Sequence, residues 1–183
     1  SEATEQNEIA LKLDSLNIGY KAFYSYHLLA LGKYDEATKT FQEVLKNEPT
    51  NSTALTNLPL ALHQLGKYNE ELDAWKEYFR IFYGNVVHVL DLGYRKGGYK
   101  EALNLEADTL LAQLKTHYSI QPFDIASLYA CAGNKEKTLD VMDLCYAMHD
   151  INLPWIASYP VFNNLHNDQR FQALCRKMNL SYK

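Results

Sequence analysis

Apolar residues recur along this chain at the three- and four-residue spacing of an amphipathic helix. Leu55, Leu58 and Leu62 form one such stripe, and polar residues fill the positions between them. No stretch shows the strict alternation that a half-buried strand requires. The pattern therefore predicts an all-α protein. The helices whose bounds it defines best are Asp35–Glu48, Asn69–Phe82 and Tyr99–His117.

A seven-residue motif recurs within this helical pattern. It reads Leu-Gly-Lys-Tyr-Asp-Glu-Ala over residues 31–37 and Leu-Gly-Lys-Tyr-Asn-Glu-Glu over residues 65–71. Corresponding residues lie 34 apart, as Gly32 does from Gly66, and Phe41 and Trp75 follow at the same period. This period resembles the tetratricopeptide repeat, a unit of two antiparallel helices. The resemblance implies a right-handed α-α superhelix of about four helical hairpins.

Later copies of the motif depart from the period. Gly97-Gly98-Tyr99 forms a third turn, but Tyr68 and Tyr99 are only 31 residues apart. We place the shortening around Tyr83 to Asn85, between two hairpins, and a fourth turn at Gly133. Glu71 stands where the repeat usually carries a small residue. It implies either looser helix packing or a side chain that turns outward.

The two ends of the chain differ from the repeats. Residues 1–17 predict an N-terminal helix or a remnant of a preceding repeat, and residues 18–149 hold the repeats. Residues 150–183 resemble the closing segment of bacterial tetratricopeptide proteins that trail regulatory or hydrolase domains. Asn167 or Asp168 is expected to begin a capping helix. Its apolar residues, with Trp155 as a further candidate, are expected to bury against the last hairpin: Phe171, Leu174 and Met178.

Composition narrows the function classes. Lys and Arg number 18 against 22 Asp and Glu, so a net charge of −4 gives no electrostatic footprint for a nucleic acid. No apolar run approaches the roughly 20 residues of a membrane helix. Three cysteines without metal-ligand or redox spacing indicate buried thiols in a reducing compartment, which favours the cytoplasm.

Candidate chemistry is sparse in the sequence. His88 and Asp91 share a helical face at i, i+3, but no third metal ligand accompanies them. The cysteines lie on apolar stripes, and no serine near a histidine has the glycines of a hydrolase elbow. We therefore expect no catalytic residue, no metal site and no cofactor, and hence a protein that is not an enzyme.

The family resemblance implies that the first helices of successive hairpins line a concave, partner-binding groove. A clamp for acidic chaperone tails is disfavoured, because Thr53 and Thr56 stand where its lysines would be. The expected function is a scaffold that binds a protein, as a peptide or helix. The alternative is a regulatory or oligomerisation domain of a larger bacterial regulator, sensor or hydrolase, with self-association. The expected groove residues are Tyr26, Asn57, His63, Gln64, His88, Asp91, Arg95 and Phe123.

Overall fold

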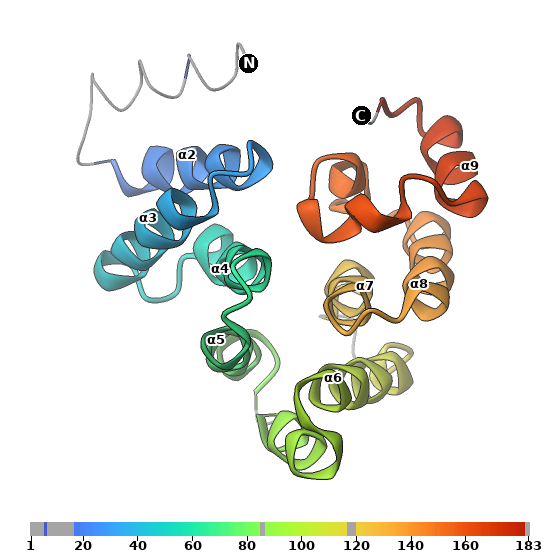
Figure 1. Ribbon diagram of the computed structural model, residues 1–183, viewed down its shortest axis with the longest axis horizontal. Helices are drawn as coiled ribbons and strands as arrows, with labels where there is room; N and C mark the ends of the chain where they lie inside the picture. Colours follow the sequence, from blue (N-terminus) through green and yellow to red (C-terminus); the bar gives the residue numbers. More distant parts are fainter. Residues whose placement is uncertain (1–5, 7–16, 85–86, 117–119, 182–183) are drawn as a thin grey trace. The chain divides into compact units, whose positions relative to one another are not determined.

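The computed structural model describes residues 17–84, 87–116 and 120–181, together with Gln6. Every regular element in these residues is a helix, so the protein is all-α as predicted (Figure 1). The chain divides into two compact units, Ser1–Ile81 and Phe82–Lys183. The predicted N-terminal helix within 1–17 lies almost wholly outside the described residues. No helix that the structure describes is long and apolar enough to cross a membrane.

The first unit is a sequence of antiparallel neighbours. Its helices are α2 (Ile18–Ala30), α3 (Tyr34–Asn47), α4 (Ser52–Gln64) and α5 (Tyr68–Phe82), the last of which ends at the unit boundary. Helix α3 packs on both α2 and α4, which also pack on each other. Ala37, Phe41 and Val44 recur along α3 on the face that is completely buried. The predicted bounds of α3 and α5 differ from the observed ones by one residue at most.

Left-handed glycines end the first helix of several hairpins. The N–H of Gly32 donates to the carbonyl of Leu29 at 3.0 Å, and that of Lys33 donates to Leu28 at 2.9 Å. This pair of bonds closes the helix end, and it needs a residue at positive φ between the two helices. The same pair recurs at two further turns. The glycines are Gly32, Gly66 and Gly133, with φ of +77°, +69° and +77°.

The third hairpin is tighter than the first two. It lies within α6 (Val87–Gln113), whose helical geometry breaks at Gly97 and Gly98. Helices α2 and α4 have 13 residues each, whereas the first arm of α6 covers only residues 87–96. The connections 48–51 and 83–86 are equally long. The missing residues therefore lie inside the hairpin, and the prediction that placed them at Tyr83–Asn85 is wrong.

Glycine also sets how closely the two arms of α6 approach. A Cβ atom added to Gly93 would lie 2.6 Å from the Cα atom of Ala102 and 2.8 Å from the carbonyl oxygen of Glu101. Both of these atoms belong to the backbone, which cannot rotate away. Gly93 therefore allows the arms to touch, and Ala102 is completely buried there.

The second unit continues the same sequential packing. Helix α6 packs on α7 (Pro122–Cys131), and α7 packs on α8 (Lys135–Ala147). Two short 3₁₀ helices follow, η1 (Leu153–Ala157) on α8 and η2 (Pro160–Leu165) on α7. Helix α9 (Gln169–Lys177) closes the chain against α8. The predicted end of the third hairpin at His117 lies outside the described residues, and α6 ends at Gln113.

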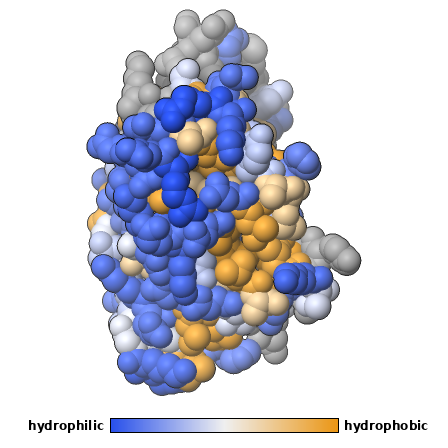
Figure 2. All heavy atoms as spheres, turned by 90° about the vertical axis from the view of Figure 1, so that its right-hand side faces the viewer, coloured by the Kyte–Doolittle hydropathy of each residue, from blue (hydrophilic) through white to orange (hydrophobic). Residues whose placement is uncertain are grey.

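The C-terminal helix buries two of the three apolar residues that were predicted for its stripe. The third, Met178, follows the helix as its C-cap and is only half-buried. Asp168 begins α9 by accepting a hydrogen bond from the N–H of Arg170 at 2.7 Å. Phe171 and Leu174 are buried. Trp155 is 48 % exposed, so it does not join them as expected. Figure 2, seen from the side of α8 and α9, shows a mostly hydrophilic face beside an apolar patch.

Gly93→Ala tests the close approach of the α6 arms. We expect the free energy of unfolding to fall by about 1–3 kcal/mol, because the added methyl group meets backbone atoms. Urea unfolding followed by circular dichroism measures it. The control is Gly19→Ala, since Gly19 is also helical but exposed, and alanine is the better helix former. A Cβ atom there would meet a side-chain atom, Oδ1 of Asn17 at 3.2 Å, and no backbone atom. Equal effects of the two substitutions would contradict the close approach.

Phe171→Ala tests the docking of α9. The ring is completely buried, so its loss leaves a cavity that costs about 3–5 kcal/mol of unfolding free energy. Thermal or urea unfolding measures the loss. Arg176→Ala, at an exposed position of the same helix, is expected to change stability by less than about 0.5 kcal/mol. A Phe171→Ala protein as stable as the parent would show that the cap is not packed.

Candidate interaction surface

Helices α2 and α4 carry the predicted groove residues of the first unit. Each helix begins at an asparagine whose side-chain oxygen accepts a backbone N–H, as N-caps do. Asn17 Oδ1 accepts from Tyr20 and Asn51 Oδ1 accepts from Ala54, both at 3.1 Å. These caps fix where the two helices start, and so which side chains share a face.

Three of these residues, Tyr26, His63 and Gln64, keep accessible surface on the first unit. Tyr26 is half-buried, and its ring lies 5.6 Å from that of His27 with an interplanar angle of 57°. Gln64, the last residue of α4, is also half-buried. An aromatic ring and an amide that keep part of their surface in water suit contact with a partner.

Asn57 lies in the packed interior of the first unit. Its side chain is 4 % exposed, and its Nδ2 donates to the carbonyl of Thr53 at 2.7 Å. This bond runs back along α4 itself. A residue held in this way has almost no surface to offer a ligand, so Asn57 does not belong to an open groove.

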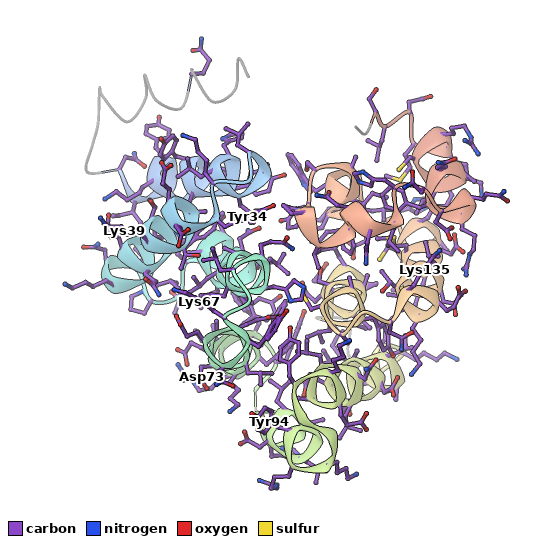
Figure 3. All side chains as sticks on the ribbon, viewed as in Figure 1. Tyr34, Lys39, Lys67, Asp73, Tyr94 and Lys135 are labelled. Atoms are coloured by element: carbon purple, nitrogen blue, oxygen red, sulfur yellow. The ribbon has the colours of Figure 1, made fainter. Side chains whose placement is uncertain are left out.

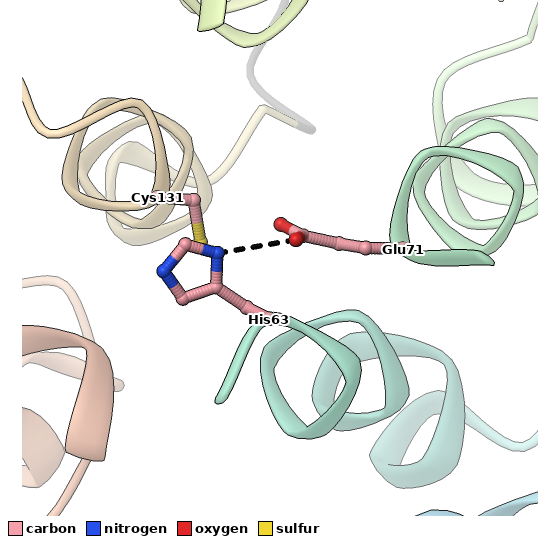
Figure 4. A group of neighbouring side chains, drawn as sticks. All are labelled: His63, Glu71 and Cys131. Carbon is pink, nitrogen blue, oxygen red and sulfur yellow. Dashed lines mark hydrogen bonds and ion pairs between the residues drawn. The ribbon is translucent and has the colours of Figure 1, made fainter. Parts of the chain in front are cut away.

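His63 binds a buried carboxylate. Its Nδ1 atom lies 3.1 Å from Oε2 of Glu71 (Figure 4). The other oxygen of Glu71 accepts a hydrogen bond from Nε1 of Trp75 at 3.2 Å. Glu71 has no exposed surface. Helices α4 and α5 therefore share a network that joins an imidazole, a carboxylate and an indole.

This network corrects the expected orientation of Glu71. The side chain does not turn outward, which was one of the two expected alternatives. It is buried, as Ala37 is at the corresponding position of the first hairpin. A buried carboxylate is tolerated when both of its oxygens find donors, because unpaired charge in the interior is costly. His63 and Trp75 supply the two contacts. Position 75 thus serves as core aromatic and hydrogen-bond donor at once.

In the second unit, the first arm of α6 presents three predicted residues along one face. His88, Asp91 and Arg95 are spaced i, i+3, i+7, which aligns side chains on a helix. His88 and Arg95 are exposed and Asp91 is partly exposed. Tyr94, also exposed, lies on the same arm (Figure 3). Charged and aromatic groups thus share the accessible surface of the arm.

Phe123 is a core residue of the second unit. Its side chain is 2 % exposed, and its ring lies edge-on to those of Tyr159 and Phe162 at centroid distances of 5.4 and 5.7 Å. Both partners belong to the segment after α8. The ring predicted to contact a ligand instead joins α7 to the C-terminal cap.

The hydrogen bonds around the start of α7 were not predicted from the sequence. The hydroxyl of Tyr83 donates to Oδ2 of Asp124 at 2.5 Å and accepts from the N–H of Gln121 at 3.1 Å. Asp150 accepts from the N–H of Phe123 at 3.0 Å. Acidic residues near a helix N-terminus are the only sequence signal for this arrangement. The partners lie up to 41 residues apart.

A second network joins α6, α7 and α8. Oδ1 of Asp108 accepts from the Tyr129 hydroxyl at 2.5 Å and from Nζ of Lys137 at 2.6 Å. Burial first, and then Asp108, raises the pKa of Tyr129. Burial also opposes ionisation of Asp108, but its bonds to Lys137 and Tyr129 outweigh this and lower its pKa. The phenol therefore stays protonated as the donor in a bond between helices.

The three cysteines are free and buried, as their positions on apolar stripes predicted. Burial is the main cause that raises the pKa of Cys145, and Asp150 and Asp124 add to it. Burial likewise raises the pKa of Cys175. A thiol acts as nucleophile or metal ligand only as thiolate, so these two are held in the unreactive form.

Comparison with known proteins gives no further identification, because no family model, curated protein or solved structure matches the chain.

Glu71→Ala tests the network between α4 and α5. It leaves the N–H of Trp75 buried without its acceptor, so we expect a loss of about 1–3 kcal/mol in unfolding free energy. Glu70→Ala is the matched control, because Glu70 is adjacent but exposed and makes only a 3.9 Å ion pair with Lys67. Denaturant unfolding measures both. Similar losses in the two variants would contradict the structural role of Glu71.

Proposed function

We propose that this chain is a non-catalytic protein-interaction module of the tetratricopeptide type, a right-handed superhelix that binds a peptide or helix. The observation that carries the proposal is the turn repeated at Gly32, Gly66 and Gly133. Each has a positive φ and the same pair of backbone bonds. A repeated turn between antiparallel helices is what a solenoid of helical hairpins requires.

The proposed binding residues are those predicted groove residues that keep accessible surface. They are Tyr26, His63 and Gln64 in the first unit, and His88, Asp91 and Arg95 in the second. Asn57 and Phe123 are left out because they are buried. Within each unit the set combines rings with polar groups and carries little net charge. The partner it suits is an apolar or mixed segment rather than a strongly acidic one.

The low reactivity of the cysteines supports a binding role over catalysis. The pKa of Cys145 is raised by burial, and two acidic groups of the second unit, Asp108 and Asp124, are engaged in bonds between elements. Groups used in this way hold helices together. Their arrangement therefore favours a scaffold whose surface, rather than its interior, contacts other molecules.

Alanine variants of the accessible groove residues test this function. A partner captured from native lysate is titrated against Tyr26→Ala, His88→Ala and Arg95→Ala by calorimetry. We expect at least one variant to weaken binding by more than about 1 kcal/mol, or roughly fivefold, as anchor residues do. Circular dichroism checks that helicity is unchanged.

The matched controls are Lys39→Ala and Lys46→Ala, at exposed positions of α3, which is a second helix. Figure 3 labels Lys39. They are expected to bind as the parent does. If the lysine variants lost the partner and the three others kept it, the binding surface would be on the second helices and the assignment would be wrong.

A further inference from the structure

Glu106 is a carboxyl group at the centre of a buried stripe. It lies on the second arm of α6, between Ala102 and Leu110, and Leu103 belongs to the same stripe. These three apolar residues and Glu106 itself have no exposed surface. Neither Oε1 nor Oε2 of Glu106 has a hydrogen-bond partner. The position is therefore one that an apolar side chain would ordinarily fill.

The surroundings of Glu106 disfavour its ionised form. Burial raises the pKa of Glu106 to about 8, from a usual value of 4.5, and no neighbouring charge contributes. A neutral carboxyl group costs far less to bury than an unpaired carboxylate. At neutral pH the folded unit therefore holds Glu106 mainly as the uncharged acid.

The titratable groups on neighbouring elements are engaged elsewhere or exposed. On α7, Asp124 binds Tyr83, Tyr129 binds Asp108, and Cys131 is a buried thiol. On the arms of α6, Lys100 and Glu101 are exposed. The first arm carries His88, Asp91, Tyr94, Arg95 and Lys96. The second arm also carries Tyr99 and Asp108, and Lys137 of α8 binds Asp108. None of these groups hydrogen-bonds to Glu106.

We propose that Glu106 is a proton-controlled latch of the second unit. While its carboxyl group is protonated, the second arm of α6 stays packed against the first arm and against α7. Loss of the proton places an unpaired charge in the stripe, and the arm opens locally to bring that charge into water. The same arm carries Ala102, whose contact with Gly93 closes the hairpin, so opening there loosens both arms.

The direction of the pH dependence follows from the two pKa values. The folded carboxyl group titrates near pH 8 and the opened one near 4.5. The stabilisation that protonated Glu106 gives the packed state is therefore complete below the lower value. It decreases as pH rises and is lost above pH 8. Between these limits the opening constant rises about tenfold per pH unit.

Hydrogen exchange of the whole chain, measured by mass spectrometry from pH 5.5 to 8.5, tests the latch. Rates are corrected for the intrinsic pH dependence of amide exchange. Peptides from the second arm of α6 are expected to lose protection by about tenfold per pH unit up to about pH 8, and the loss levels off above it. Peptides from α3 in the first unit serve as the internal reference.

Glu106→Gln is expected to remove the pH dependence, because the amide has a similar shape and does not ionise. Glu106→Leu provides a second non-ionising variant should the amide fold poorly. Glu101→Gln, at an exposed position of the same arm, is the control and is expected to behave as the parent. A pH dependence that persists in both Glu106 variants, or that is absent from the parent, would overturn the proposal.

Discussion

The structure depends on how the chain reverses direction at the end of a helix. A left-handed residue lets two successive N–H groups bond back to the last turn, and it directs the chain into the next helix. The same pair of bonds ends α8 at His149 and α9 at Asn179, with φ of +56° and +53°. These residues lack glycine's freedom at positive φ, so both turns carry backbone strain that the glycine turns avoid. One backbone device therefore serves the hairpins and the C-terminal cap alike.

Two buried glutamates show how differently the units tolerate charge in their interiors. Glu71 is held by Trp75 and His63, so its two oxygens are both bonded. Glu106 has no such donors and depends on its proton instead. A paired carboxylate fixes an arrangement, whereas an unpaired one makes it conditional on pH. The two residues carry the same side chain, and their neighbours alone decide between these outcomes.

Local signals in the sequence predicted the helices and their turns well. Gly32 and Gly66 end helices because of their own conformational freedom, so neighbouring residues suffice to identify them. The exposure of a side chain is set by distant segments instead. Phe123 is covered by Tyr159 and Phe162, which follow it by more than thirty residues. Helical spacing assigned Phe123 to one face of its helix. It could not show that a distant segment covers this face.

Apolar packing and ion pairs both hold α9 against α8, but they contribute differently. Arg170 of α9 reaches a row of acids on α8, at 2.8 Å from both Asp140 and Asp143. These groups are largely exposed, and ion pairs in water contribute little to stability. The buried apolar side chains of α9, Phe171, Leu174 and Cys175, therefore supply most of the docking energy. The ion pairs add a preferred position for α9, because Nη2 of Arg170 contacts two carboxylates that lie one turn apart on α8.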